Sequence, residues 1–181
     1  DECRRAEEIG LGACFISERF NVKEAASLTG AACAVSDRIG VATSVTNHNT
    51  RHPMVTAAWA TTLHRLSGGR FSLGIGRGFD MQFQAIGLQP TSMKQMEDFV
   101  GIMRRLWKGE TILGHDGPAG KYPFLRLDER FDEDIPVMCA AIGPKTMSWG
   151  GSVFDGVMLH TFFTDETLRQ CVERVRTGAE K

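Results

Sequence analysis

The sequence lacks several features that would assign it to a familiar class. No apolar run reaches the ~20 residues that a membrane-spanning helix requires. Neither sign of charge is in excess, because 21 lysines and arginines face 22 aspartates and glutamates, for a formal net charge of -1. Nucleic acids and anionic membrane surfaces are bound by clustered positive charge, so we expect neither as a partner. No targeting peptide is recognisable, and we expect a cytoplasmic protein.

The sequence also lacks paired cysteines and a metal-binding motif. The five cysteines are odd in number, lie far apart and form no CxxC: Cys3, Cys14, Cys33, Cys139 and Cys171. This spacing argues against a disulfide framework or a zinc knuckle and fits a reducing compartment. His48 and His52 are four residues apart, but Pro53 follows them and no HExxH glutamate lies between them. We therefore predict no bound metal and interpret the two histidines as loop or capping residues.

Strand and helix patterns alternate along all 181 residues. Short apolar, β-rich runs predict five strands, at 13–17, 39–45, 70–76, 135–141 and 155–162. Apolar residues at helical spacing, with Pro, Thr or Gly at the ends, predict six helices, at 1–9, 23–38, 53–66, 91–107, from 144 and at 165–176. Such alternation is typical of βαβ units in a parallel sheet.

Two α/β architectures remain, an open doubly wound sheet and a TIM barrel. The run Gly74-Ile-Gly76-Arg-Gly78 is spaced GxGxG, and Phe79 stands where the dinucleotide fingerprint needs its third glycine. Polar or glycine-rich residues follow each of the first three strands, as the active-site loops of a barrel do. We predict a TIM (β/α)8 barrel, present as one incomplete domain over 1–181, with further strands expected before Asp1 and after Lys181.

One long segment, Glu110–Asp134, has no helical period. It is rich in glycine, proline and charge, and it contains one strand-like piece, KYPFLRL. Connections of this length without helix usually form a lid or an insertion. We predict an insertion over about 110–134, on the side where a small-molecule substrate enters.

Four groups of residues at predicted strand ends could carry chemistry. Glu18 and Arg19 could form an ion pair with each other at the rim, or could face a cofactor ring. The second strand ends in polar residues that could bind the edge of a ring or could simply satisfy hydrogen bonds within the loop. Gly76 and Gly78 could admit a ligand or could form a tight turn. The remaining candidates are Ser44, Val45, Thr46 and Asn47 after the second strand, and Ala141, Ile142, Gly143, Pro144 and Lys145 after the fourth.

The turn after the fourth strand leads into a helix. Free N–H groups, the helix dipole and the side chain of Lys145 would suit a phosphate there. The alternative is an ordinary helix start, which every α/β protein has in numbers, and on the residues alone this alternative is favoured.

Four stretches together carry a family resemblance: AEEIGLGACFISERFNVKEAA, IGVATSVTNHNTRHPMVTAAWATTLHRLSGGRFSLGIGRG, QMEDFVGIMRRLWKGE and IPVMCAAIGPKTM. They resemble the luciferase-like monooxygenase superfamily, and within it the coenzyme F420-dependent oxidoreductases. The resemblance covers almost the whole chain. Its segments R-H-P-x-x-x-A, L-S-G-G-R-F-x-L-G-I-G-x-G and G-x-M-R-R-L-W are jointly specific.

The resemblance implies a TIM barrel with an insertion, which binds F420 or FMN in its mouth. It implies hydride transfer between F420 and a small organic substrate. A non-proline cis peptide is implied at Ser44–Val45, against the ring of the cofactor, with Thr46 and Asn47 beside it. Gly76 and Gly78 would line the cofactor wall, with Phe79 and Asp80 near its polar edge. The segment 141–145 matches the family's phosphate turn, and Glu18 matches an acidic residue near the ring.

One position departs from the family pattern. Several members have a catalytic histidine directly after the acidic residue, where this sequence has Arg19. Arginine stays protonated at neutral pH and cannot act as a general base. Either the chemistry differs, or Arg19 binds an anionic substrate or stabilises the reduced cofactor. Glu18 and Arg19 are the predicted catalytic pair.

Two alternatives stand beside this interpretation. The first is an FMN-dependent monooxygenase on the same scaffold. The second is a non-catalytic truncated homologue that assembles with another chain, since five parallel strands leave open sheet edges. A homodimer is one assembly that we consider.

Overall fold

A parallel sheet of five strands forms the centre of the computed structural model, which describes residues 1–181. Along the sheet the strands follow in the order β1 (Ala13–Ile16), β2 (Gly40–Thr43), β3 (Phe71–Ile75), β6 (Val137–Ala140) and β7 (Gly156–Met158). Every crossover therefore steps in the same direction. A barrel wall is built in this way, whereas a doubly wound sheet reverses its direction at a switch point.

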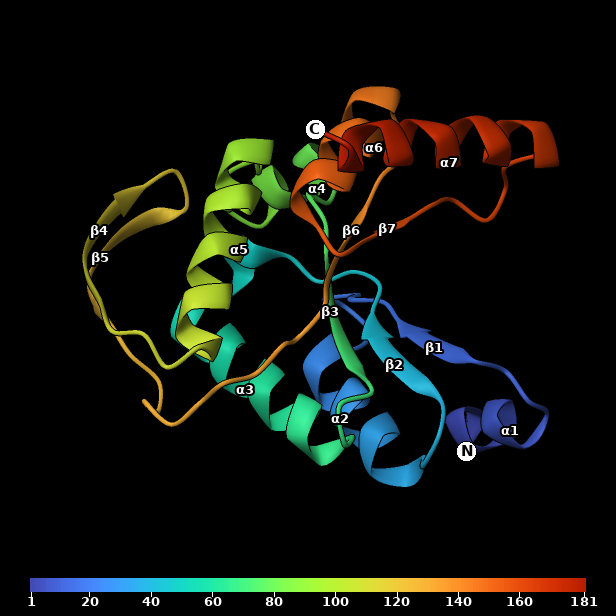
Figure 1. The fold of residues 1–181 in the computed structure, drawn as a ribbon, viewed down its shortest axis with the longest axis horizontal. Helices are drawn as coiled ribbons and strands as arrows, with labels where there is room; N and C mark the ends of the chain where they lie inside the picture. The colour runs from blue at the N-terminus through green and yellow to red at the C-terminus, as the bar shows by residue number, and fades with distance from the viewer.

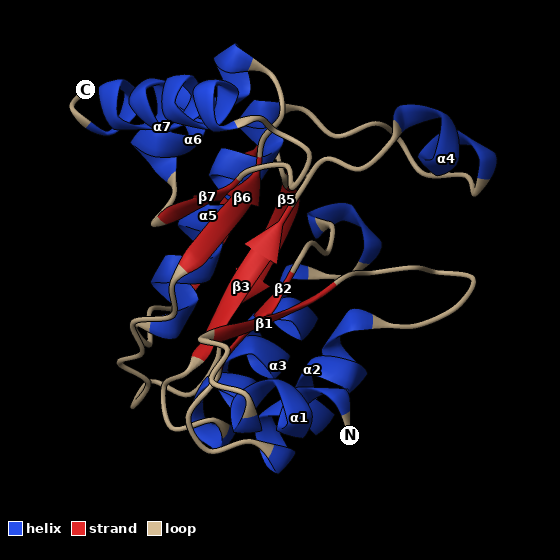
Figure 2. Cartoon of the chain, turned by 90° about the vertical axis from the view of Figure 1, so that its right-hand side faces the viewer, coloured by secondary structure: helices blue, strands red, loops and turns tan.

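Seven α-helices accompany the strands. They are α1 (Glu2–Glu8), α2 (Ala25–Val35), α3 (Pro53–Leu66), α4 (Asp80–Ala85), α5 (Met93–Trp107), α6 (Pro144–Val153) and α7 (Asp165–Ala179). Figure 1 shows α2, α3 and α5 following one another around one side of the sheet, while α6 and α7 lie beside β6 and β7. Figure 2 shows α4 set apart from the sheet on a long loop. The helices other than α4 thus cover the outer side of a curled sheet.

The predicted insertion contains an antiparallel hairpin, β4 (Ile112–Gly117) and β5 (Gly120–Leu125). It is held against α5, because Asp98 Oδ2 accepts from the Ala119 N–H at 2.8 Å and lies 3.0 Å from His115 Nε2. The sequence predicted only the second of the two strands. The first was missed because it carries little apolar alternation and buries only its first side chain.

Most of the other element predictions are confirmed, and two more need correction. The helix at 53–66 has the expected bounds, whereas the expected strand at 155–162 ends already at Met158. Only β6 pairs with this strand, so fewer ladder hydrogen bonds extend it. The short helix α4 was not predicted, because six residues are too few to show a helical period.

The core lies between the sheet and α3 and α5. Trp107 is fully buried and donates its indole N–H to the Ala57 carbonyl oxygen at 3.2 Å, which ties α5 to α3. Met96 and Met103 are buried in this layer. Cys139 is buried, and burial raises the pKa of its thiol to about 12, so it is a protonated core residue. None of the helices has the length and apolar character needed to cross a bilayer.

Candidate functional site

Three loops meet at the carboxyl ends of β1, β2 and β3, where they border a cleft of about 370 Å³. Because parallel strands end at one edge of a sheet, loops far apart in sequence come together there. The cleft is lined by residues from these loops and from α4: Ser17, Glu18, Arg19, Phe20 and Asn21; Ser44, Val45 and Asn47; Gly78 and Phe79; and Gln82, Phe83 and Ile86. No residue of the β4–β5 hairpin lines it.

Glu18 is the most heavily bonded side chain of this cleft, and its side chain is only 2% exposed. Its Oε1 accepts from the Ala25 N–H at 2.9 Å, and its Oε2 accepts from the Thr46 hydroxyl at 2.9 Å and from Arg51 Nη2 at 2.8 Å. Arg51 also donates to Thr46 Oγ1 at 2.9 Å and pairs with Glu24. The charge of the Glu18 carboxylate is thus compensated inside the protein.

The suggested ion pair between Glu18 and Arg19 is not formed, because the partner of Glu18 is Arg51. Successive residues at the end of a strand point to opposite sides, so neighbours in sequence are poorly placed to pair. The side chain of Arg19 is exposed and makes no hydrogen bond or ion pair. Of the predicted catalytic pair, Arg19 alone presents a free charge.

The peptide bond between Ser44 and Val45 is cis, as the family resemblance implied. The two residues that follow are bonded to the protein. The Thr46 N–H donates to the Gly74 carbonyl oxygen at 3.0 Å, and the Asn47 side-chain amide donates to the Gly76 carbonyl oxygen at 2.6 Å. These bonds fix the loop beside β3, and a role for either side chain at a ring edge stays a prediction.

Gly76 and Gly78 are required by the protein's own packing. A Cβ on Gly76 would lie 2.5 Å from Val45 Cγ2, and a Cβ on Gly78 would lie 2.7 Å from the ring of Phe83. Gly78 also has a φ of +72°, which side chains other than glycine rarely adopt. The glycine-rich run therefore lets the loop after β3 approach the loop after β2 and helix α4 closely. Its role as a cofactor wall stays a prediction.

The turn at 141–145 leads into α6 without a capping side chain. Ala141 is buried and bonded to Met158, whereas Ile142 is 66% exposed and the exposed Lys145 has no ion pair. The N–H groups of Lys145 and Thr146 make no hydrogen bond within the protein. Two orphan donors, the helix dipole and a free ammonium together form an arrangement able to bind an anion.

His48 follows the cleft residue Asn47 and is buried, and its Nδ1 has no hydrogen-bond partner. Its ring lies 5.4 Å from that of Phe99, centroid to centroid. Burial disfavours the charged imidazolium and lowers the pKa of His48 to about 4. His52, by contrast, caps α3 by accepting from the Met54 N–H at 3.2 Å, as predicted for a capping histidine.

We expect the free energy of unfolding to fall as the pH drops from 6.5 towards 4. In that window the unfolded chain protonates His48, whereas the folded protein does not, so acid favours unfolding by about 3 kcal/mol at full protonation. The His48→Phe variant keeps the ring contact and removes the titrating group. Urea unfolding at several pH values should show that the wild type loses more stability than the variant. If the free energies of unfolding of the two proteins change with pH in parallel, the lowered pKa of His48 is contradicted.

Two residues of this region were not predicted from the sequence. Arg51 lies 33 residues from Glu18, and only its place in the R-H-P segment could have drawn attention to it. His160 follows β7 at the same edge of the sheet, where a polar side chain after a strand was the available signal. Its Nδ1 accepts from the Phe162 N–H at 3.2 Å, which leaves Nε2 as the donor of the neutral ring.

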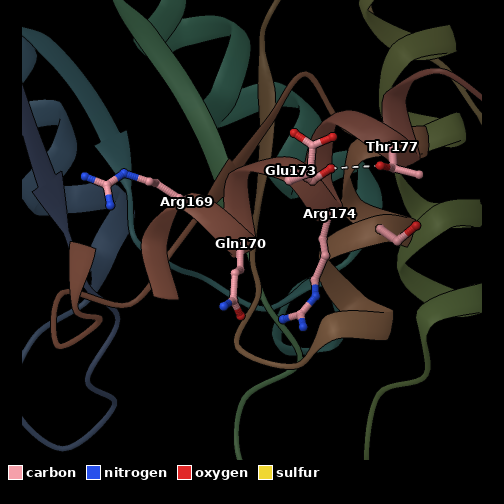
Figure 3. A pocket seen from close by; sticks show the side chains of 6 residues that line it. Arg169, Gln170, Glu173, Arg174 and Thr177 are labelled. Carbon is pink, nitrogen blue, oxygen red and sulfur yellow. Dashed lines mark hydrogen bonds between the residues drawn. The ribbon is translucent and has the colours of Figure 1, made fainter. Parts of the chain in front are cut away.

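A larger cavity, of about 540 Å³, lies away from this cleft, between α6 and α7. Figure 3 shows its side chains, with Arg169 extending to one side while Gln170 and Arg174 extend together in another direction. All of its lining residues are polar, and it is open to solvent. No hydrophobic side chain lines it, whereas ligand pockets are mostly apolar, so the cleft at the strand ends is the stronger candidate site.

The fold and the site define a part of a parallel α/β barrel whose carboxyl-end loops form a cleft. The chain belongs to the luciferase-like monooxygenase family, whose model matches residues 1–181. It is 28% identical over 179 residues to a 5,10-methylenetetrahydromethanopterin reductase of Methanolobus tindarius, covering 97% of this chain and 53% of the relative. It is 30% identical to an F420-dependent glucose-6-phosphate dehydrogenase of Beutenbergia cavernae, covering 83% of this chain and 48% of the relative.

Solved structures show the same fold. The coenzyme F420-dependent tetrahydromethanopterin reductase of Methanopyrus kandleri matches with a TM-score of 0.84 at 22% identity, over 97% of this chain and 55% of that one. The oxygenating constituent of 3,6-diketocamphane monooxygenase from Pseudomonas putida, in complex with FMN, matches with a TM-score of 0.82 at 19% identity, over 99% and 56%. The predicted TIM-barrel class is confirmed, and the chain spans about half the length of the curated relatives it matches.

Proposed function

We propose that this chain belongs to an oxidoreductase that transfers a hydride between coenzyme F420 and a small organic substrate. Both curated relatives reported above act in F420 or tetrahydromethanopterin chemistry by name. The observation that carries the proposal is the pairing of two features at one edge of the sheet. A cleft lined by both apolar and polar side chains lies on Ser44 and Val45, and an uncapped helix N-terminus lies at Gly143.

The residues present fit a ring cofactor that carries a phosphate. Val45 and Ser44 would lie under the ring, and the orphan N–H groups of Lys145 and Thr146, with the Lys145 ammonium, would hold the phosphate. Ile142 belongs to the same turn, is 66% exposed and would contact the body of the cofactor. When bound, F420 accepts or donates the hydride, and the protein supplies orientation and electrostatics.

The chain's own residues then have separate tasks. Glu18 and Arg51 hold the hydroxyl of Thr46 in place and so orient the loop that carries Ser44 and Val45. The apolar side chains of the cleft would cover the faces of a bound ring. Arg19 places a positive charge at the rim of the cleft.

Titration of the protein with F420 and, separately, with FMN tests the proposed cofactor. We expect F420 to bind selectively, as followed by its fluorescence. Selective binding of FMN would assign the protein to the monooxygenase alternative, which the FMN-bound structural neighbour favours. If neither cofactor binds, the first claim to fall is that the turn at 141–145 binds a phosphate. That result would favour the alternative of a non-catalytic homologue that assembles with another chain. Light scattering would test the homodimer, and fractionation the expected cytoplasmic location.

Gly143 offers a sharper test of the phosphate turn. A Cβ at this N-cap would meet no atom within 4 Å, so a side chain is tolerated there. In Gly143→Asp the carboxylate would cap α6 and repel a phosphate. We expect the stability to rise by about 0.5–1 kcal/mol while the affinity for F420 falls at least about tenfold.

Gly143→Asn is the matched control, because it caps the helix without adding charge. Its affinity for F420 should lie between those of the wild type and Gly143→Asp. Calorimetric titration and urea unfolding measure the two quantities separately. Unchanged affinity in Gly143→Asp would overturn the placement of the phosphate at this turn.

A further inference from the structure

Only two charged residues line the cleft, Glu18 and Arg19. The Glu18 carboxylate is paired with Arg51 and is 2% exposed, so it offers no free charge to a ligand. The guanidinium of Arg19 is exposed and has no partner in the protein. The cleft therefore presents one uncompensated positive charge.

The backbone of Arg19 is held firmly although its side chain is free. Its N–H donates to the Lys23 carbonyl oxygen at 3.1 Å, and its own carbonyl oxygen accepts from the N–H groups of Val22 at 2.7 Å and Lys23 at 2.8 Å. This closed turn fixes the backbone of Arg19 at the edge of the cleft that Arg19 lines. Because the backbone is already fixed, less conformational entropy is lost when the side chain binds a ligand.

The walls beside Arg19 are apolar and partly aromatic. Phe20 is 51% exposed, Phe79 is 74% exposed and Ile86 is 56% exposed, and all three line the cleft. The ring centroids of Phe20 and Phe83 lie 6.3 Å apart, which joins the loop after β1 to α4. A flat apolar molecule would cover these surfaces, and an anionic group on it would meet the guanidinium.

We propose that the substrate carries a carboxylate or another anionic group on a flat, largely apolar body, and that Arg19 binds that group. The inference rests on the proposed function in calling this ligand the substrate. A bound cofactor ring could also offer an anionic edge, so the experiment has to separate these two sources of the same chemistry.

The probes for the test are naphthalene-2-carboxylate and its neutral analogue naphthalene-2-carboxamide. Both are titrated into the protein, and binding is followed through the backbone amide NMR signals of Phe20 and Asn21. We expect the carboxylate to bind about tenfold more tightly than the carboxamide, because a hydrogen bond to a charged group is worth more than a neutral one. Equal affinities would overturn the proposal.

Arg19→Gln should remove this preference by weakening only the carboxylate, and Arg19→Lys should retain part of it. Arg77→Gln is the matched control, because Arg77 is exposed on the neighbouring glycine-rich loop but does not line the cleft. It should leave the preference unchanged. If Arg77→Gln loses as much of the carboxylate preference as Arg19→Gln, the preference arises from the general positive charge of the region. It would then not arise from a contact with Arg19, and the proposed role of Arg19 would be contradicted.

Repeating the titrations with saturating F420 distinguishes substrate from cofactor. A carboxylate preference that persists beside bound F420 supports a substrate subsite at Arg19. Displacement of the probe by F420, or F420 affinity about tenfold lower in Arg19→Gln, would assign the guanidinium to the cofactor and overturn the proposal. If F420 fails to bind while the preference stands, the proposed cofactor is wrong and the anion site remains.

Discussion

Replacing Arg51 by methionine should lower the free energy of unfolding by about 3 kcal/mol, because breaking a buried ion pair leaves an uncompensated charge. The Arg51 side chain is 17% exposed and that of its partner Glu18 is 2% exposed, so solvent reaches neither charge freely. The hydroxyl of Thr46 would lose one of its two charged partners as well. Urea unfolding at neutral pH measures the loss.

Arg65→Met is the control for this prediction. The ion pair of Arg65 with Glu133 is similar in kind, but the Arg65 side chain is 54% exposed, and its loss should cost less than about 1 kcal/mol. Adding Glu18→Gln to Arg51→Met removes the orphan charge and retains an acceptor for the Ala25 N–H. The double variant should therefore regain part of the stability. A loss in Arg51→Met no greater than in Arg65→Met would show that the network is not structural.

Gly74→Ala should be the most damaging single-methyl substitution at the site. Its Cβ would lie 1.9 Å from the Thr43 carbonyl oxygen and 2.7 Å from Met158 Cε. The methionine can move, but the carbonyl belongs to the neighbouring strand, so β2 and β3 would have to separate. We expect a loss of about 3 kcal/mol or more, at the upper end of overpacking effects. Chemical denaturation measures it, and thermal melting serves where the variant is only partly folded.

Gly101→Ala supplies the matched comparison. Gly101 lies in the middle of α5, and a Cβ there meets no atom within 4 Å. Alanine favours helix by about 1 kcal/mol over glycine, so this variant should be at least as stable as the wild type. Similar behaviour of the two alanine variants would contradict the close approach of β2 to β3.

The sequence by itself determined the order and kind of most elements. Alternating β-rich runs and helical periods predicted all five strands of the sheet and six of the seven helices, because each pattern depends on neighbouring residues. Proline at the first turn and histidine at the cap gave α3 its start at Pro53. The hairpin strand β4 and the short α4 escaped prediction, because their side chains carry too little periodic signal.

At the site, sequence reasoning found the right loops and left the partners open. Glu18, the Ser44–Val45 peptide and the turn at Gly143 were expected at the strand ends, and the structure places them there. Which charge meets Glu18 was decided only by the tertiary structure, because the crossover through α2 brings Arg51 to the end of β1. Pairing across 33 residues leaves no local pattern in the chain. The free charge of Arg19 follows from the same fact, since the folded chain has supplied its neighbour with another partner.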